Sequence, residues 1–305
     1  MVRYSKLPFR LLARDYGTDI IYTPMILAHE FIRSQYARDS DFTTCPEERE
    51  STSEDRQHAL IAQFASSEPE EFARAAELIA PWVDGVDLNC GCPQSWAIKE
   101  GIGCSLMTSP DLVASMVKAA KLRLGTSKSV SCKIRIDKNL DITKHWIKTV
   151  EEAGVDYITI HGRTRSQRSS TPPDYEAIRI LKSQARVPVF ANGDVYSIAD
   201  ADKIVTMTNV AGVMAARGIL ENPSLFAGHA SAPPECVHRL LEHVVRHPIP
   251  FQLIMHHMSE LANNMKLSRA FKKQLMDCQD LLDLIDFVED KWRQEDTHVL
   301  DTSVG

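Results

Sequence analysis

The segment VSCKIRIDKNLDITKHWIKTVEEAGVDYITIHGRTR, residues 130–165, contains the pattern that decides the fold. Two runs in it, Val130–Ile134 and Tyr157–His161, have the length and the apolar character of buried strands. Between them, Thr143–Glu152 carries apolar residues at helical spacing. A strand, a helix and a second strand in this order predict a parallel pair of strands that is covered by the connecting helix.

The same alternation extends from residue 18 to residue 229 and predicts an α/β fold. The other strands that we predict are Ile20–Tyr22, Leu60–Phe64, Gly85–Asn89, Val187–Ala191 and Ala211–Met214. The other predicted helices are Leu7–Tyr16, Glu70–Ile79, Pro110–Leu122, Tyr175–Lys182 and Ile198–Val205.

Two architectures share this alternation, the TIM (β/α)8 barrel and the open doubly wound sheet. Polar residues follow nearly every predicted strand, namely Thr23, Gln63, Asn89, Lys133, His161 and Asn192. A barrel builds its site from the ends of many strands, whereas an open sheet concentrates its site at one switch point. We therefore predict a TIM barrel. Because a helix pattern begins as early as Leu7, we expect this barrel to lack its first strand.

The alternation stops at about Pro233, and apolar residues then recur at helical spacing. We predict a barrel domain over residues 1–230, a small all-helical domain over residues 233–292 and a tail over residues 293–305. The helical domain carries basic residues that fit either a solvated helix face or a phosphate-binding face. These residues are Arg239, Arg246, Lys266, Arg269, Lys272 and Lys273.

Composition limits the possible functions of the 305-residue chain. A formal net charge of −6 gives no overall attraction to nucleic acid or to an anionic membrane, so any RNA contact requires a local basic face. Seven scattered cysteines without a CxxC pair predict reduced thiols, and no apolar stretch approaches the ~18 residues of a membrane span. No signal peptide or metal-ligand spacing is present. We expect a cytoplasmic monomer that binds neither a membrane nor a metal, with a mobile loop over Thr44–His58.

The motif DLNCGCP, residues 87–93, follows a short apolar strand, and its glycine and proline predict a turn. We favour Cys92 over Cys90 as a functional residue, because chemistry in a barrel lies in the turns after strand ends. A thiol is mostly protonated at neutral pH, so Cys92 is a candidate proton donor. The alternative is that each cysteine is a small buried hydrophobic residue.

Charged residues end the next two strands. Lys133 ends the run SCKIR, where its burial is costly unless it meets an anion; the alternative is a lysine that reaches the barrel rim. His161 lies in TIHGRTR, where its ring can hydrogen-bond a cofactor or a substrate carbonyl. Arg163 and Arg165 of the same motif can contact phosphates.

Two glycine-containing motifs follow the last two strands, ANGDV at residues 191–195 and MAARG at residues 214–218. The loops after strands seven and eight of a barrel commonly bind a phosphate through backbone N–H groups and a helix N-terminus. Gly193 permits close backbone approach, and Arg217 supplies a positively charged planar group. These loops predict a site for a phosphate-bearing cofactor.

Together these motifs resemble the tRNA-dihydrouridine synthase family, and within it the eukaryotic type that acts at positions 20a and 20b. The resemblance rests on MVRYSKLPFR, AQF, DLNCGCP, CKIR, TIHGRTR, FANGDV and GVMAARGILENP, in the family's order across residues 1–226. NxGCP together with HGRT is the most specific part. Met1 stands where the family has the second residue of a Pro-Met pair, and Ala216 stands where many members have glycine.

The resemblance implies FMN as the cofactor, NADPH as the reductant and tRNA as the partner. The implied reaction reduces the C5–C6 double bond of a D-loop uridine, with Cys92 as the general acid that protonates C5. The residues implied to hold the flavin are Met1, Gln63, Lys133, His161, Asn192, Gly193, Asp194, Ala216 and Arg217. The residues assigned to the substrate are Asn89, Arg163, Arg165, Lys266, Arg269 and Lys273.

Two other functions stay open on the sequence alone. A flavin-dependent reductase of a free pyrimidine would share the barrel and the cofactor, but it would not need the basic helical segment. A catalytically inactive RNA-binding homologue would result if the missing strand abolished cofactor binding.

Overall fold

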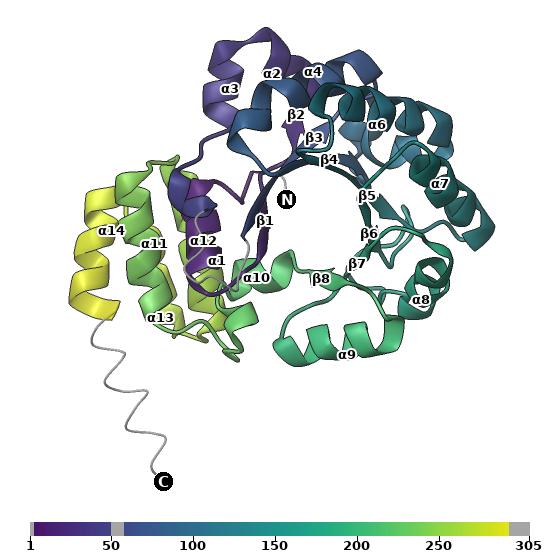
Figure 1. Ribbon diagram of the computed structural model, residues 1–305. Coiled ribbons are helices and arrows are strands. Elements are labelled where there is room, and N and C mark those ends of the chain that lie inside the picture. Colours follow the sequence, from purple (N-terminus) through teal and green to yellow (C-terminus); the bar gives the residue numbers. More distant parts are fainter. Residues whose placement is uncertain (1–2, 50–57, 293–305) are drawn as a thin grey trace.

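The computed structural model describes residues 3–49 and 58–292 of the chain. Within these residues eight strands form one parallel sheet, which curves into most of a barrel with helices around its outside (Figure 1). The predicted barrel is thereby confirmed. The strands are β1 (Ile20–Tyr22), β2 (Ile26–Leu27), β3 (Ala59–Ala65), β4 (Gly85–Cys90), β5 (Ser129–Arg135), β6 (Tyr157–His161), β7 (Val189–Asn192) and β8 (Gly212–Met214).

The helices that cover this sheet alternate with its strands, as in any parallel barrel. Pro69 and Pro110 occupy the first positions of α4 and α6, where the missing N–H group costs nothing. Asp174 and Ser197 are the N-caps of α8 and α9, and their side chains accept hydrogen bonds from the first turn. The helices up to residue 221 are α1 (Leu7–Asp15), α2 (Ala28–Arg33), α3 (Gln35–Asp41), α4 (Pro69–Ile79), α5 (Ser95–Lys99), α6 (Pro110–Leu124), α7 (Leu140–Glu152), α8 (Tyr175–Gln184), α9 (Ile198–Thr208) and α10 (Arg217–Glu221).

The sheet is open between β8 and β1. Its strand order runs from β1 through β3, β4, β5, β6 and β7 to β8, and no strand among the described residues bridges the two ends. Helix α1 lies beside this opening, where Phe9 and Ala13 line a cavity. This arrangement agrees with the predicted barrel that lacks one strand. The short strand β2, which pairs with the end of β3, was not predicted.

Four helices follow the barrel, and the first of them, α11, packs against α1 (Figure 1). They are α11 (Glu235–Arg246), α12 (Phe251–Asn264), α13 (Arg269–Asp277) and α14 (Leu281–Phe287), and a π-helical turn over Val288–Trp292 ends the described chain. Their buried apolar residues form a second core, which also includes Leu12 of α1. Asp15 of α1 accepts a hydrogen bond from His243 of α11 at 2.8 Å when the histidine Nε2 carries a proton. The domain boundary at residues 230–233 stays a prediction, and the tail at 293–305 lies outside the described residues.

Two buried arginines of α1 hold the segment that precedes β3. Arg10 Nε donates to Glu48 Oε1 at 2.6 Å, and the two side chains are only 2% and 0% exposed. Arg14 donates to the backbone carbonyl of Glu48 at 2.8 Å. The prediction of a mobile loop over Thr44–His58 is therefore wrong for Thr44–Arg49. Residues 50–57 lie outside the described residues.

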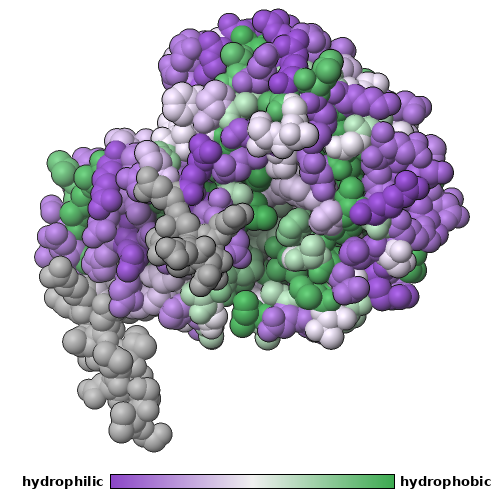
Figure 2. Space-filling view, viewed as in Figure 1, coloured by the Kyte–Doolittle hydropathy of each residue, from purple (hydrophilic) through white to green (hydrophobic). Residues whose placement is uncertain are grey.

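The outer surface of the barrel is mostly hydrophilic, whereas apolar residues are visible in the hollow at its centre (Figure 2). None of the helices in the described ranges has the length and the apolar character needed to cross a membrane.

We expect Glu48→Gln to lower the free energy of unfolding by about 3 kcal/mol, because it leaves the buried Arg10 guanidinium without a counter-charge. Glu47→Gln is the matched control, since Glu47 is exposed one residue away. Urea denaturation of both variants measures the difference. Equal destabilisation by the two substitutions would contradict the importance of the buried pair.

Candidate functional site

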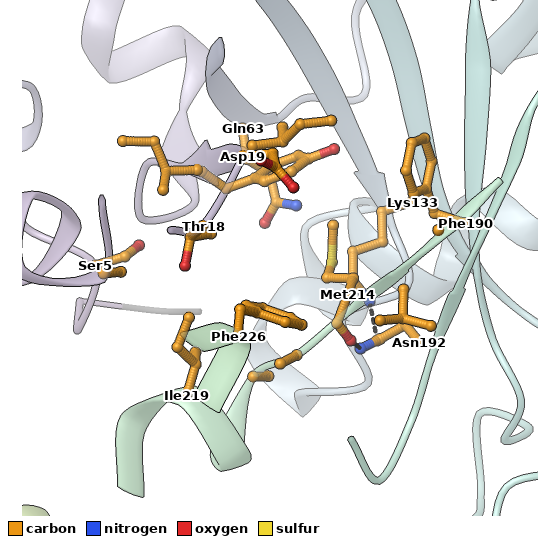
Figure 3. Close-up of a pocket in the computed structure, with 18 of the residues that line it drawn as sticks. Ser5, Thr18, Asp19, Gln63, Lys133, Phe190, Asn192, Met214, Ile219 and Phe226 are labelled. Carbon is orange, nitrogen blue, oxygen red and sulfur yellow. Dashed lines mark hydrogen bonds between the residues drawn. The ribbon is translucent and has the colours of Figure 1, made fainter. Parts of the chain in front are cut away.

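A cavity of about 730 Å³ opens at the carboxyl ends of the strands and continues down the opening between β1 and β8 (Figure 3). Its volume lies in the range of small-molecule and cofactor sites. It brings together six of the residues predicted from the sequence, which lie in the last residues of the strands or in the loops that follow them. These six are Gln63, Asn89, Cys92, Lys133, Asn192 and Ala216.

Lys133 and Asn192 join three strands at the bottom of the mouth. Lys133 Nζ donates to Asn192 Oδ1 at 2.8 Å, and Asn192 Nδ2 donates to the carbonyl of Met214 at 2.8 Å (Figure 3). Burial lowers the pKa of Lys133 to about 8, although the charge of Asp87 opposes that shift. The lysine is therefore largely protonated at neutral pH and places a positive charge in the cavity wall.

The turn that bears Cys92 is held by the side chain of Asn89. Asn89 Oδ1 accepts hydrogen bonds from the backbone N–H groups of Gly91 at 3.1 Å and Cys92 at 2.9 Å. Cys92 is 9% exposed and lines the cavity. Asn89, predicted as a substrate contact, thus also positions the cysteine.

Gly103 is a second support for this turn that the sequence analysis missed. Its φ of +63° lies in the left-handed region, and a Cβ built there would come within 2.6 Å of the Cys92 carbonyl oxygen. Cys104 N also donates to this carbonyl at 2.9 Å. Only glycine fits at this position, because any larger side chain would displace the turn.

Arg135, also unassigned by the sequence analysis, links the cysteine turn to the loop after β6. Its Nε donates to the carbonyl of Gly91 at 3.0 Å, and its Nη1 donates to the carbonyl of Thr164 at 3.0 Å. The run SCKIR therefore supplies two cavity residues, Lys133 and Arg135, two positions apart on the same face of β5.

Asp87 is the third residue that the sequence analysis left without a role. Its carboxylate is fully buried and accepts hydrogen bonds from Gln63 Nε2 at 2.8 Å and from Ser131 Oγ at 2.7 Å. Gln63 Oε1 in turn accepts a hydrogen bond from Asn89 Nδ2 at 2.9 Å. The side chains of β3 and β4 thus form one buried polar network beneath the mouth.

His161 lies beside Asn192 in the sheet, since the two residues are register partners on β6 and β7. Burial lowers the pKa of His161 to about 2, and the neighbouring charges of Lys133 and Arg135 act in the same direction. The ring is therefore neutral. Its Nδ1 is buried and has no hydrogen-bond partner among the described residues. This nitrogen can bond to a ligand at the mouth.

Asp194 lies between two arginines in the loop after β7. Its carboxylate accepts hydrogen bonds from Arg163 Nη2 and from Arg217 Nη2, the latter at 2.6 Å. Arg163 is 2% exposed and also donates to the carbonyls of Ser169 and Thr171, so it is committed to protein contacts. Its assignment to the substrate stays a prediction.

The other predicted site residues lie outside the cavity lining. Gly193 has a φ of +134°, so an L-residue would be strained there. Arg217 begins α10 and is half-exposed, and Arg165 is exposed in the loop after β6. Three basic residues of the helical segment are exposed and do not line the cavity, namely Lys266, Arg269 and Lys273. Met1 lies outside the described residues.

No group of three or more histidine, cysteine or acidic side chains suited to a metal occurs in the described part of the chain. The described site instead has cationic and amide groups around an open cavity. Such groups suit an anionic ligand or a ligand with carbonyl oxygens.

Relatives with assigned names share most of this chain. A tRNA-dihydrouridine(20a/20b) synthase [NAD(P)+] of Schizosaccharomyces pombe is 46% identical over 269 residues, which cover 88% of this chain and 79% of the relative. The protein of the same name in Saccharomyces cerevisiae is 42% identical and covers 94% and 77% of the two chains. The human tRNA-dihydrouridine(20a/20b) synthase [NAD(P)+]-like protein is 38% identical and covers 96% and 89%.

Among solved structures, 6-hydroxypseudooxynicotine amine oxidase from Pseudomonas geniculata N1 is similar with a TM-score of 0.55. The two chains are 11% identical over 72% of this chain and 43% of the other, so the likeness concerns the fold alone. A family model is more specific. The model described as "Dihydrouridine synthase (Dus)" matches residues 1–304 of this chain. With the relatives above, this match shows that the chain belongs to the dihydrouridine synthase family.

Proposed function

We propose that this protein is a tRNA-dihydrouridine synthase that reduces the C5–C6 double bond of D-loop uridines at positions 20a and 20b. FMN is its cofactor and NADPH its reductant. The observation that carries the proposal is the cavity at the barrel mouth, whose wall contains Cys92 together with Gln63, Lys133 and Asn192. A proton donor and a set of flavin-binding groups thus face one space that is open to solvent.

The residues present fit an anionic flavin nucleotide. The His161 Nδ1 atom is buried without a partner in the described chain and so has bonding capacity left for a ligand. Lys133 would stabilise negative charge on the ring, because its ammonium group is buried in the cavity wall. Arg217, held by Asp194, would bind the phosphate beside the backbone of Gly193.

When bound, FMN supplies the hydride that is delivered to C6 of the uracil. The chain supplies the proton for C5 from the Cys92 thiol, which the Asn89 network holds at the mouth. The target base must leave the RNA stack to reach the cavity.

The tRNA is bound through its backbone by exposed basic residues. Lys266, Arg269 and Lys273 project from α13 and the turn before it, and none of them forms an ion pair with another described residue. Unpaired cations of this kind neutralise phosphates and release counterions. A reductase of free pyrimidines would not need these phosphate contacts. An assay that compares tRNA with free uridine as the substrate distinguishes the two functions.

We expect Cys92→Ala to bind FMN normally and to lose dihydrouridine formation by roughly 10²- to 10⁴-fold, because only the general acid is removed. Single-turnover reduction of unmodified tRNA, read by mass spectrometry, measures this loss. Cys278→Ala is the control, since Cys278 lies in the helical segment away from the cavity. Turnover at the native rate in Cys92→Ala would refute the proposed acid.

FMN affinity should fall as the pH rises through about 8, because Lys133 loses its proton there; burial lowers the pKa of this lysine to about 8. The negative charge of Asp87 raises the pKa of Lys133 and the positive charge of Arg135 lowers it, so the pH of the transition depends on all three residues. We expect a loss of roughly tenfold between about pH 7 and about pH 9 in fluorescence titrations of the flavin-free protein. Lys133→Met should bind weakly at both values. A pH dependence that survives in Lys133→Met would assign the effect to another group.

We expect Lys273→Glu to weaken tRNA binding and to reduce its salt dependence, with unchanged flavin content. Lys118→Glu on α6 is the matched control, because it makes the same charge change at an exposed site on the barrel. Filter-binding assays at several salt concentrations measure both effects. Equal salt slopes for the native protein and Lys273→Glu would show that α13 does not contact phosphates.

A further inference from the structure

A chain of hydrogen bonds runs beneath the mouth from Asp87 through Gln63 and Asn89 to the Cys92 turn. The groups at its two ends determine which atoms of the two amides donate and which accept. The Asp87 carboxylate can only accept, so Gln63 must turn its NH2 group to Asp87 and its carbonyl to Asn89. The backbone N–H groups of Gly91 and Cys92 can only donate, so Asn89 must turn its carbonyl to them. Only one orientation of the two amides satisfies both ends.

We propose that Asp87 is a positioning residue that acts through Gln63 and Asn89. It fixes the turn that holds Cys92 at the cavity, and it fixes which polar group Gln63 presents to the cavity. The effect of Asp87 on the turn is independent of the reaction, whereas its effect on turnover rests on the proposed function.

Asp87 is an unfavourable residue for stability alone. Burial raises the pKa of Asp87 to about 6, although the hydrogen bonds from Ser131 and Gln63 oppose that shift. Because the folded-state pKa lies above the ordinary value, ionisation of Asp87 lowers stability; this cost develops as the pH rises toward about 6 and is complete above that value. A neutral amide of the same shape would avoid the cost.

Two substitutions reverse the first link of the network without breaking the rest. Gln63→Glu alone places a second carboxyl group opposite Asp87. At a pH where both groups are ionised neither can donate, so the link is lost. In the double variant Asp87→Asn, Gln63→Glu, the new amide at position 87 donates to the new carboxylate at position 63. That carboxylate still accepts from Asn89, whose own orientation is unchanged.

The rate at which iodoacetamide alkylates Cys92 in flavin-free protein reports the state of the turn. Peptide mass spectrometry follows Cys92, with Cys278 in the same sample as the internal reference. We expect Gln63→Glu to raise the rate at Cys92 by roughly tenfold, which corresponds to one lost hydrogen bond to a charged group. The double variant should return to within about twofold of the native rate.

Asp87→Asn alone separates positioning from a structural role. Ser131 Oγ lies 3.5 Å from the carbonyl of Val86 and can donate there while it accepts from the new amide. We therefore expect near-native alkylation of Cys92 and a Tm at about pH 7.5 that is no lower than that of the native protein. A clearly lower Tm would mark Asp87 as a structural residue and overturn the proposal.

The double variant is the decisive protein. Alkylation as fast as in Gln63→Glu would overturn the proposal, and so would a native rate in Gln63→Glu itself. If Gln63→Glu does not fold, Gln63→Met removes both links without added charge and should show the same tenfold increase.

FMN titration of the same proteins tests the second half of the proposal. The double variant places a carboxylate in the cavity lining at position 63 in place of a neutral amide, so its FMN affinity should stay at least roughly tenfold below native even though the turn is restored. Native FMN affinity in the double variant would overturn the proposal that Asp87 orients Gln63. None of these readouts uses tRNA, so an absence of dihydrouridine formation by the native protein would reject the proposed function and leave this result unaffected.

Discussion

Charged groups buried inside the barrel constrain every part of this site. Parallel strands packed on both faces exclude water, so a charge there needs a partner or must be neutralised. The carboxylate of Asp87 meets two donors, and the ammonium group of Lys133 meets Asn192. His161 meets the same constraint differently, because burial and nearby cations keep its ring neutral. The cavity wall therefore carries a positive charge, which favours an anionic ligand.

Hydrophobic patterning predicted the barrel well because parallel strands are apolar on both faces. The bounds of Ile20–Tyr22 and Tyr157–His161 match the structure, and β7 begins two residues later than predicted, after Pro188. Proline lacks the N–H group that a strand residue donates, which explains this later start. Strand β2 has two residues, too few to produce a periodic pattern. Its position depends on pairing with β3, which the local sequence does not contain.

The candidate site was predicted where its residues lie near the carboxyl ends of strands, as Cys92, Lys133 and Asn192 do. Asp87 was missed although a signal existed, because it lies two positions before Asn89 and so on the same face of β4. The need for glycine at position 103 had no such signal. It arises from contact with the Cys92 turn, and only the folded chain brings the two segments together. The buried contacts of Arg163 depend in the same way on a loop conformation that spacing does not predict.

Helix α10 connects the cofactor side of the barrel to the helical segment. Arg217, its first residue, is held by Asp194, while Ile219 and Leu220 pack with Phe9 of α1. The same α1 contributes Leu12 to the core of the helical segment, and α10 also contacts α12 directly. The position of α13 is thus linked through packed helices to the loop after β7, which contains Asp194. Because α1 contributes to both cores, the exposed basic residues of the helical segment keep a fixed position relative to the cavity.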